Sequence, residues 1–203
     1  MEVFKFEPKS HFGSVCYVLK DGNSSLIIDP SVSPDEILAE CKSLSPQFII
    51  LTHTHFDHMF SLTSCMEAFP DATLLVSSKD IDGFTSPYYN VSLLFYNIPV
   101  VYDGQYRTVT HGESFIFADN ILSFYNYPGH TKGSLVISYR DALFTGDLIF
   151  DGGTRGRTDL MGGDEGQLQY SISMLLKQFD ESCTIYPGHG NSFSLKLAKQ
   201  WFK

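Results

Sequence analysis

The chain has 203 residues, of which 43% are hydrophobic, and these values suit a layered domain with a sizeable core. Its 23 acidic and 14 basic side chains give a formal net charge of −9, which repels nucleic-acid phosphates and anionic lipid surfaces. We therefore expect one domain over residues 1–203, a small-molecule substrate, and neither nucleic acid nor membrane as a partner.

The start of the chain and its cysteines predict the cellular compartment. Met1 to Ser10 is charged and alternating, so it predicts a first strand and no signal peptide. No run in the sequence approaches the roughly 18 apolar residues of a membrane helix. Cys16, Cys41, Cys65 and Cys183 are scattered without a C-x-x-C pair, as is typical of buried thiols in a reducing cytoplasm. We therefore predict a cytoplasmic protein.

The first quarter of the chain predicts antiparallel strands followed by a helix. Short β-rich runs separated by turns cover Val3 to Phe6, Val15 to Leu19 and Leu26 to Ile28, and Asp21-Gly22-Asn23 is the turn between the last two. A helix is expected after Ser33, because a capping hydroxyl is followed by Pro34 at the first helical position and by Glu36 three residues on.

A buried strand over Phe48 to Leu51 ends directly before a cluster of histidines. The pattern then predicts a helix over Leu62 to Phe69 and a buried strand over Thr73 to Val76. Gly83 to Tyr106 loses periodicity and is rich in aromatic residues, so we interpret it as an irregular excursion from the core. Its aromatic side chains could form the wall of a substrate pocket or simply cover a sheet edge.

The second half repeats this order of strands and helices. Predicted strands cover Ser114 to Phe117, Leu122 to Tyr125, Leu135 to Tyr139, Ala142 to Thr145 and Thr184 to Tyr186, with tight turns at Asp119-Asn120 and Arg140-Asp141. Predicted helices cover Leu168 to Phe179 and Phe193 to Trp201. Two similar halves of this kind predict an α/β fold of two sheets with helices outside, a four-layer αββα sandwich.

Ligand-type side chains are unusually dense after the buried strand at Phe48 to Leu51. Four of them, His53, His55, Asp57 and His58, fall within six residues. Neutral imidazole and carboxylate groups suit zinc and neighbouring transition metals, whereas solvated loop histidines would not require this density. Along an extended turn, His53 and His55 can point one way while Asp57 and His58 point toward a neighbouring position. The segment therefore predicts a metal site.

Three later segments each place a glycine beside a ligand-type residue at the end of a β-rich run. They are Gly129-His130, Gly146-Asp147 and Gly188-His189. Glycine lets the backbone approach a metal site without a side-chain clash. Each dipeptide alone is weak evidence, but together with the histidine cluster they indicate one shared metal site.

These motifs resemble the metallo-β-lactamase superfamily over nearly the whole chain. They are His53-Thr54-His55-Phe56-Asp57-His58, Pro128-Gly129-His130-Thr131, Thr145-Gly146-Asp147 and Tyr186-Pro187-Gly188-His189-Gly190. Within that superfamily, Gly129 to Ser134 and Gly156 to Leu160 are similar to segments of the glyoxalase II-like hydrolases, which cleave thioesters such as hydroxyacyl-glutathione. The sequence ends shortly after His189, so we expect the additional helical domain of full-length glyoxalase II enzymes to be absent.

The resemblance implies a binuclear centre with two zinc ions, although iron or manganese could occupy one or both positions. His53, His55 and His130 would hold one ion, Asp57, His58 and His189 the other, and Asp147 would bridge them. The implied reaction is hydrolysis of a thioester, or of another ester, by a hydroxide that bridges the ions, with Asp57 and Asp147 as the catalytic carboxylates.

Other activities remain open at this stage. Persulfide dioxygenases of the same superfamily use ligands equivalent to His53, His130 and Asp147 for one iron, and lactonase activity is a further alternative. A β-lactamase is disfavoured because no signal peptide is predicted and because the common type has cysteine at the position of Asp147. A tRNA-processing nuclease is disfavoured by the net charge of −9. A closed structural metal site is the non-enzymatic alternative.

Several charged residues near these motifs have a functional and a structural interpretation. Arg155 and Arg157 could attract an anionic substrate, but Arg157 could equally pair with Asp159 or Asp164 and brace its loop. Lys132 is expected to be solvated. His11 and His111 match no motif and are expected to be ordinary surface or turn histidines.

Overall fold

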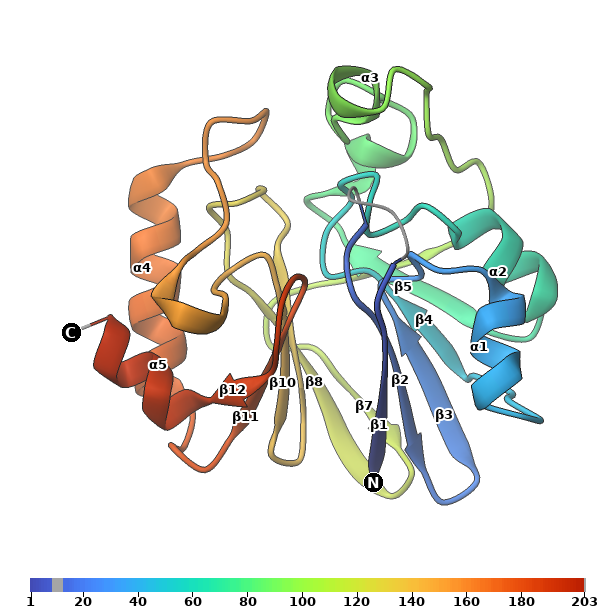
Figure 1. Cartoon of the computed structure of the whole chain (residues 1–203), viewed down its shortest axis with the longest axis horizontal. Coiled ribbons are helices and arrows are strands. Elements are labelled where there is room, and N and C mark those ends of the chain that lie inside the picture. The colour runs from blue at the N-terminus through green and yellow to red at the C-terminus, as the bar shows by residue number, and fades with distance from the viewer. Residues whose placement is uncertain (9–12, 203) are drawn as a thin grey trace.

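The computed structural model describes residues 1–8 and 13–202 of the chain. Two sheets stand face to face, and helices cover the outer face of each, so that four layers follow one another across the molecule (Figure 1). In the described ranges each sheet has six strands. The predicted α/β sandwich of αββα type is therefore confirmed.

The first sheet comes from the N-terminal half and has the strand order β1-β2-β3-β4-β5-β6. Its strands are β1 (Glu2–Phe6), β2 (Cys16–Asp21), β3 (Ser24–Ile28), β4 (Phe48–Ile50), β5 (Thr73–Ser77) and β6 (Arg107–Val109). The first three are antiparallel, while β3 to β6 are parallel. Helices α1 (Pro34–Glu40) and α2 (Leu62–Ala68) connect the parallel strands β3, β4 and β5. The Ser33 hydroxyl caps α1 as predicted, accepting the Glu36 N–H at 3.3 Å.

The second sheet has the order β12-β11-β10-β9-β8-β7. Its strands are β7 (Ser114–Phe117), β8 (Asn120–Asn126), β9 (Leu135–Tyr139), β10 (Ala142–Gly146), β11 (Thr184–Pro187) and β12 (Phe193–Ser194). Helix α4 (Glu165–Gln178) joins the parallel strands β10 and β11, and α5 (Leu195–Trp201) follows β12. Both helices lie on the outer face of this sheet.

The core follows from the alternation of side chains along the strands. In β2 and β3, Tyr17 and Leu26 face the second sheet and join the apolar layer between the two sheets. Their neighbours Val18 and Ile27 face α1 and α2 instead. A third apolar cluster lies between the second sheet and helices α4 and α5, and includes Leu168. Strands with apolar residues on both faces are the reason for the continuous hydrophobic runs in the sequence.

Some predicted boundaries change in the structure. Strand β6 was not predicted, because Arg107 to Val109 is short and largely exposed and is paired only through Leu75 to Ser77 of β5. The turn between β7 and β8 is formed by Ala118 and Asp119, both with positive φ, so it lies one residue earlier than predicted. Helix α5 begins at Leu195 and not at Phe193, since Phe193 pairs with Ile185 in the sheet.

The aromatic excursion contains two short helices, the 3-10 helix η1 (Ile81–Phe84) and α3 (Ser92–Phe95). It lies above the sheet ends at the top of the view in Figure 1. The predicted N-terminal strand is present as β1, whereas the end of that prediction at Ser10, and His11, lie outside the described residues. Within the described ranges, no helix combines the length and apolar character needed to cross a membrane.

Candidate metal centre

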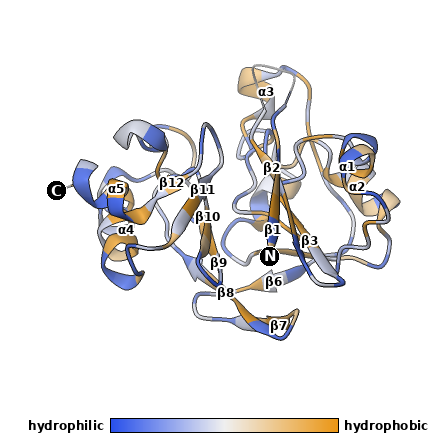
Figure 2. Cartoon of the chain, turned by 60° about the horizontal axis from the view of Figure 1, so that its bottom comes forward, coloured by the Kyte–Doolittle hydropathy of each residue, from blue (hydrophilic) through white to orange (hydrophobic). Residues whose placement is uncertain are grey.

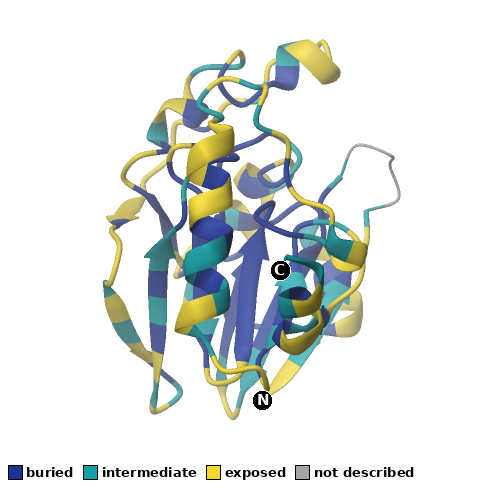
Figure 3. Cartoon of the chain, turned by 90° about the vertical axis from the view of Figure 1, so that its left-hand side faces the viewer, coloured by how far each residue is buried: buried dark blue, intermediate teal, exposed yellow. Residues whose placement is uncertain are grey.

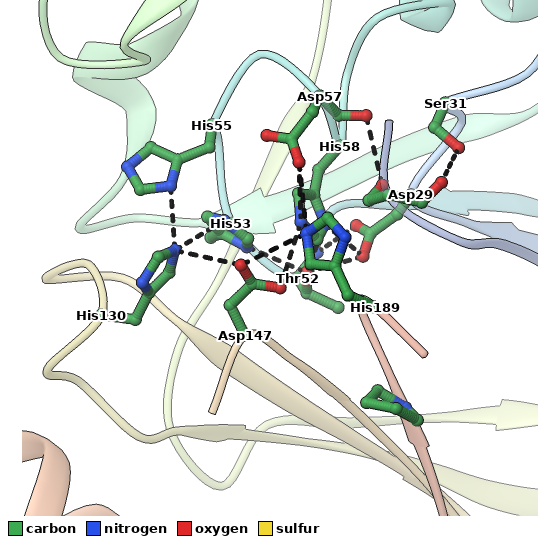
Figure 4. Close-up of polar contacts among 12 residues, drawn as sticks. Asp29, Ser31, Thr52, His53, His55, Asp57, His58, His130, Asp147 and His189 are labelled. Carbon is green, nitrogen blue, oxygen red and sulfur yellow. Dashed lines mark hydrogen bonds and ion pairs between the residues drawn. The ribbon is translucent and has the colours of Figure 1, made fainter. Parts of the chain in front are cut away.

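The seven predicted ligands converge at one end of the two sheets, in four loops that each follow a strand (Figure 4). The loop after β4 carries four of them: His53, His55, Asp57 and His58. The loop after β8 carries His130. Asp147 directly follows β10, and His189 comes two residues after the end of β11. Because these strands end at the same edge, residues distant in sequence meet in one cluster.

Three buried imidazoles form the first group, from His53, His55 and His130. The His130 Nε2 atom lies 3.2 Å from His53 Nε2 and 2.9 Å from His55 Nδ1. The Nδ1–H of His130 donates to the carbonyl of Arg157 at 2.7 Å, which leaves Nε2 as a lone-pair donor toward the group. Three nitrogen atoms so close together suit a cation between them.

The second group consists of Asp57, His58 and His189. Asp57 Oδ2 lies 3.3 Å from His189 Nε2 and 3.7 Å from His58 Nε2. His58 is fully buried, whereas the side chain of His189 is 40% exposed. This group therefore lies at the solvent side of the cluster, where a substrate can reach it.

Asp147 lies between the two groups. Its Oδ2 is 3.5 Å from His130 Nε2 and 3.5 Å from His189 Nε2, and its Oδ1 is 3.3 Å from His58 Nε2. One carboxylate thus contacts a member of the first group and two members of the second. This is the position that a bridging ligand requires.

Asp29, which was not among the predicted site residues, orients two candidate ligands, His53 and His58, from behind the cluster. Its carboxylate accepts the N–H of Thr52 at 2.8 Å, the Thr52 hydroxyl at 2.7 Å and His58 Nδ1 at 2.9 Å. The Thr52 hydroxyl in turn lies 3.2 Å from His53 Nδ1 and can accept its proton. Nε2 of both histidines is thereby directed into the cluster.

Asp80, also not predicted, lies behind the first group and is fully buried. Its Oδ2 accepts the N–H of Thr54 at 2.8 Å and the hydroxyl of Thr131 at 3.2 Å. Its Oδ1 accepts the Tyr89 hydroxyl at 2.8 Å and the N–H of Gly133 at 3.2 Å. One carboxylate therefore joins the loop that carries His53 and His55 to the loop that carries His130.

Two of the predicted glycines do allow close approach at the cluster. A Cβ atom on Gly188 would overlap Asp147 Oδ1 and His58 Cε1, and one on Gly146 would overlap the side chain of Thr52. Gly129 differs from the prediction, because it packs against the backbone of Leu168 in α4 and not against the ligands. Its φ of +137° still favours glycine at that position.

Two imidazoles of the first group, those of His53 and His55, are held neutral. Burial lowers the pKa of His53 well below its usual range, and His58 and His130 lower it further. Burial and the neighbouring His130 lower the pKa of His55 to about 3. Neutral imidazole is the form that ligates a metal, so His53 and His55 are ready to bind without losing protons.

The second group has the opposite character. Burial alone would lower the pKa of His58 and His189, but the nearby carboxylates outweigh it, so the pKa of His58 is raised and that of His189 reaches about 10. Burial would likewise raise the pKa of Asp147, yet His189 and His58 hold it well below its usual range. Protons on two imidazoles here balance the carboxylates, and a divalent cation could satisfy the same carboxylates and displace those protons.

Unpaired buried atoms give a direct test of whether a cation fits. Within the described residues, His58 Nε2 and Asp147 Oδ1 are buried and form no hydrogen bond, although the two atoms are close enough for an ion pair. Buried polar atoms are normally paired, because desolvation without a partner is unfavourable. His58 Nε2 and Asp147 Oδ1 face each other within the cluster at 3.3 Å, and the ligand atoms of each group lie within 4.8 Å of one another. The donor set and its spacing therefore suit a divalent metal centre.

A cavity of about 390 Å³ opens onto the cluster. His55, Asp57, His130, Asp147 and His189 form its floor. Its walls come from the loop at the ligand cluster, the aromatic excursion and the glycine-rich loop after Asp147, and they contain Phe56, Val91, Phe95, Phe150, Arg155, Gly156, Arg157 and Leu160. A small organic molecule could thus reach the cluster.

The remaining charged residues of the sequence analysis take structural positions. Arg157 Nε and Nη2 each donate to Asp159 at 2.7 Å, so the pairing with Asp159 is the one observed. Arg155 pairs with Glu165 at 2.6 Å. Lys132 and His111 are exposed, and neither lines the cavity.

The sequence contained a signal for Asp29 but not for Asp80. Asp29 directly follows the apolar run Leu26 to Ile28, and Asp147 follows the run at Ala142 to Thr145 after one glycine. Asp80 comes three residues after β5, among polar residues, and nothing in its sequence context distinguishes it from a solvated aspartate. Only its burial reveals a role.

Comparison with known proteins identifies relatives of similar length. The probable metallo-hydrolase YqgX of Bacillus subtilis is 31% identical over 185 residues, covering 86% of this chain and 83% of the relative. The probable polyketide biosynthesis zinc-dependent hydrolase PksB of the same species is 26% identical over 178 residues, covering 86% and 72% of the two chains.

Solved structures share the whole fold. The BLEG-1 B3 metallo-β-lactamase superimposes with a TM-score of 0.89 at 26% identity, covering 98% of this chain and 97% of the other. TTHA1623, solved in a di-iron-bound form, has a TM-score of 0.83 at 26% identity and covers 98% of both chains. The family model described as the metallo-β-lactamase superfamily matches residues 11–189, a range that contains all seven clustered side chains. The chain therefore belongs to the metallo-β-lactamase superfamily.

Proposed function

We propose that this protein is a binuclear metal-dependent hydrolase of thioesters. His53, His55 and His130 would hold one divalent ion, and Asp57, His58 and His189 would hold the second. Asp147 would bind both. The position of Asp147 carries the proposal, because its carboxylate lies within 3.5 Å of His130 on one side and of His58 and His189 on the other.

Zinc is the metal that we propose, with iron or manganese as alternatives in one or both positions. Imidazole and carboxylate ligands suit all three. One relative is described as zinc-dependent, and one structural neighbour was solved with two iron ions. A pair of such ions supplies a Lewis acid for the substrate carbonyl and lowers the pKa of water toward about 7.

The residues of the chain position the reactants around that centre. Asp29 and the carbonyl of Arg157 fix the ring orientations of His58 and His130, so the ligand atoms need little rearrangement. We assign to Asp57, on the cavity floor, the second role of accepting a proton from the attacking water. Water gives one proton to Asp57 and adds to the carbonyl carbon, and the carbon–sulfur bond breaks with its electron pair leaving on sulfur. A thiolate and a carboxylic acid result, and the acid loses the second proton of the water to solvent as a carboxylate.

The choice of a thioester rests on the leaving group. No lysine, tyrosine or serine is among the described residues that line the cavity, so it offers no dedicated proton donor away from the metal ligands. A thiol with a pKa near 8.5 departs as its anion without assistance, whereas an amine or alkoxide leaving group needs a proton. The motifs similar to glyoxalase II-like hydrolases point to the same class, and glyoxalase II-like character is part of the proposal.

The cavity and the charge of the chain suit a small-molecule substrate. Its volume of about 390 Å³ lies in the usual range for small organic ligands. A formal net charge of −9 opposes binding to nucleic acid or to anionic membranes. We propose that the protein acts on a small thioester in the cytoplasm.

The test is to measure metal content and activity on one preparation. Protein purified without added metal is analysed by plasma mass spectrometry, and hydrolysis of S-lactoylglutathione and of a simple acyl thioester is assayed on the same sample. About two transition ions per chain, and thioesterase activity that a chelator removes and added zinc restores, are expected. A single iron with oxygen uptake on glutathione persulfide would replace the proposal with a dioxygenase.

A further inference from the structure

The side walls of the cavity are apolar. Besides the candidate ligands, Arg155, Gly156 and Arg157, the described residues that line the cavity are five with apolar side chains: Phe56, Val91, Phe95, Phe150 and Leu160. Phe56 and Val91 are buried, and Phe150 packs edge-on against the ring of His189 at a centroid distance of 5.8 Å. A ligand group in this space contacts carbon atoms on several sides.

The two arginines of the cavity are already bound to carboxylates. Both guanidinium contacts of Arg157 go to Asp159, and the guanidinium also lies over the ring of Phe95 at 5.3 Å from its centroid. Arg155 is paired with Glu165 at 2.6 Å. An anionic substrate group would have to displace these carboxylates, whereas an uncharged group would leave the pairs intact.

Apolar surface continues from the cavity to the outside of the molecule. The ring of Phe56 stacks on Tyr96 at 5.9 Å, and Tyr96 meets Phe60 edge-on at 5.3 Å. Phe60, Leu94, Phe95 and Tyr96 are all exposed, and we call these four residues the aromatic cap. Figure 2 shows α3 largely in the orange shades of hydrophobic residues, and Figure 3 shows exposed segments beside buried ones at the top of the molecule, where the excursion lies.

The wall beneath the aromatic cap is held in a fixed position. The N–H of Phe56 donates to the carbonyl of Asn90 at 2.9 Å, and the Asn90 amide donates to the carbonyls of Gly83 and Val100, each at 2.7 Å. The next residue, Val91, has a φ of +58°, which a β-branched side chain rarely adopts. These bonds hold the isopropyl group of Val91 at the cavity in spite of the strain.

We infer that the cavity accepts an uncharged, apolar acyl chain that runs from the metal cluster along Val91 and Phe95 to the aromatic cap. This inference rests on the proposed thioesterase function and specifies its substrate class. Phe95 is the main specificity residue. It lines the cavity, belongs to the aromatic cap, and its ring lies beneath the guanidinium group of Arg157.

Chain length is the variable that tests this substrate class. The metal-loaded protein is assayed with acetyl, butyryl, hexanoyl and octanoyl thioesters of N-acetylcysteamine, together with the anionic succinyl thioester. We expect kcat/KM to rise by about fourfold for each methylene group that the cavity buries, and the succinyl thioester to be poorer than butyryl. Equal rates across the series, or a preference for succinyl, would overturn the inference.

Two variants locate the effect in the wall. Phe95→Ala is expected to reduce the ratio of octanoyl to acetyl kcat/KM by at least about tenfold, because it removes a large apolar contact. Tyr170→Ala, which removes an exposed aromatic side chain on α4 away from the cavity, is the matched control and should keep the wild-type ratio. An unchanged ratio in Phe95→Ala would contradict the assignment of the wall.

Asp159→Asn tests the role of the arginine pairing. This substitution frees Arg157 and should raise kcat/KM for the succinyl thioester up to about fivefold, the range of an exposed ion pair, while octanoyl changes little. No hydrolysis of any thioester would overturn the proposed function and this inference with it, whereas hydrolysis without chain-length dependence would overturn this inference alone.

Discussion

The Asp80 carboxylate accepts the backbone N–H of Thr54 at 2.8 Å, and Thr54 is the residue between the candidate ligands His53 and His55. Asp80 is fully buried and no cation pairs with it among the described residues, so hydrogen bonds alone satisfy its carboxyl oxygens. Each of its oxygens accepts one backbone N–H, from Thr54 on one and from Gly133 on the other. Asp80 therefore acts as a positioning residue that sets the spacing of the His53 and His130 loops.

Asp80→Asn should weaken the first metal position. An asparagine can place its amide oxygen toward only one of the two backbone N–H groups, so its NH₂ group must face the other. Residues behind metal ligands typically change metal affinity by about 10- to 100-fold, and we expect a loss in this range for one ion per chain. Competition titration with a chromophoric chelator, and the visible spectrum of the cobalt-substituted protein, would measure it.

Tyr89→Phe is the control for that substitution. It removes one hydroxyl donor to Asp80 but keeps both backbone contacts, so the loops should stay in register and both ions should bind nearly as in the wild type. Asp80→Asn protein that binds two ions with unchanged affinity and spectrum would show that Asp80 does not position the ligands.

Removal of the central carboxylate should eliminate turnover. Asp147→Ala takes away the group that contacts both halves of the cluster, so we expect loss of the second ion and a fall in kcat larger than about 100-fold. Metal content and thioesterase rates measured on the same sample would test this. A variant with two bound ions and wild-type rates would contradict the two-metal mechanism.

Gly188→Ala tests the close packing of the cluster. Its Cβ would overlap Asp147 Oδ1 and His58 Cε1, and the backbone cannot retreat freely, because Gly188 N–H donates to Gly146 at 2.9 Å and its carbonyl accepts from Val15 at 2.7 Å. We expect metal affinity to fall by at least about tenfold, as for other groups that orient ligands. Isothermal titration with zinc provides the measurement.

Gly166→Ala is the matched control for the glycine substitution. Its Cβ would meet only Asp164 Oδ1, at an ordinary 3.4 Å, and alanine should favour helix α4 by up to about 1 kcal/mol. This variant should bind metal as the wild type does. Equal metal affinity in Gly188→Ala and Gly166→Ala would mean that the cluster tolerates displacement of Asp147.

The metal-free protein should lose stability as the pH rises above neutrality. The pKa of His189 is raised to about 10 because nearby Asp147 and Asp57 outweigh its burial, whereas the unfolded chain titrates near 6.5. Between these values the folded state holds a proton that the unfolded state has lost, so the free energy of unfolding falls with increasing pH. His58, whose pKa is also raised, acts in the same direction.

The same protein should also lose stability as the pH falls below about 6.5. His55 has a pKa lowered to about 3, so in this range the unfolded chain binds a proton that the folded state excludes. With metal bound, the ligands carry no protons and the stabilisation by metal should increase with pH. Urea midpoints from pH 5 to pH 9, with and without chelator, would show this; a chelated sample that becomes more stable from pH 6.5 to pH 9 would contradict the assignment.

The sequence alone predicted the four layers and the seven clustered residues. Apolar runs such as Phe48 to Leu51 are local signals for buried strands, and the pattern at Ser33 is a local signal for a helix cap. The structure contains both features. The cluster of candidate ligands was predictable from two local patterns. Four ligand-type side chains lie within six residues, and each of the other three comes directly after a glycine near the end of a β-rich run. Local sequence chemistry was sufficient for these features.

Tertiary structure decided everything that depends on contacts between distant segments. Strand β6 exists only because β5 pairs with it, and Asp80 matters only because Thr54, Tyr89, Thr131 and Gly133 converge on it. The sequence left Asp159, Asp164 and an anionic substrate as possible partners of Arg157, and the loop conformation selected Asp159. These outcomes require the folded chain. A buried carboxylate, a paired edge strand and the wall of a cavity each depend on contacts between segments that are far apart in the sequence.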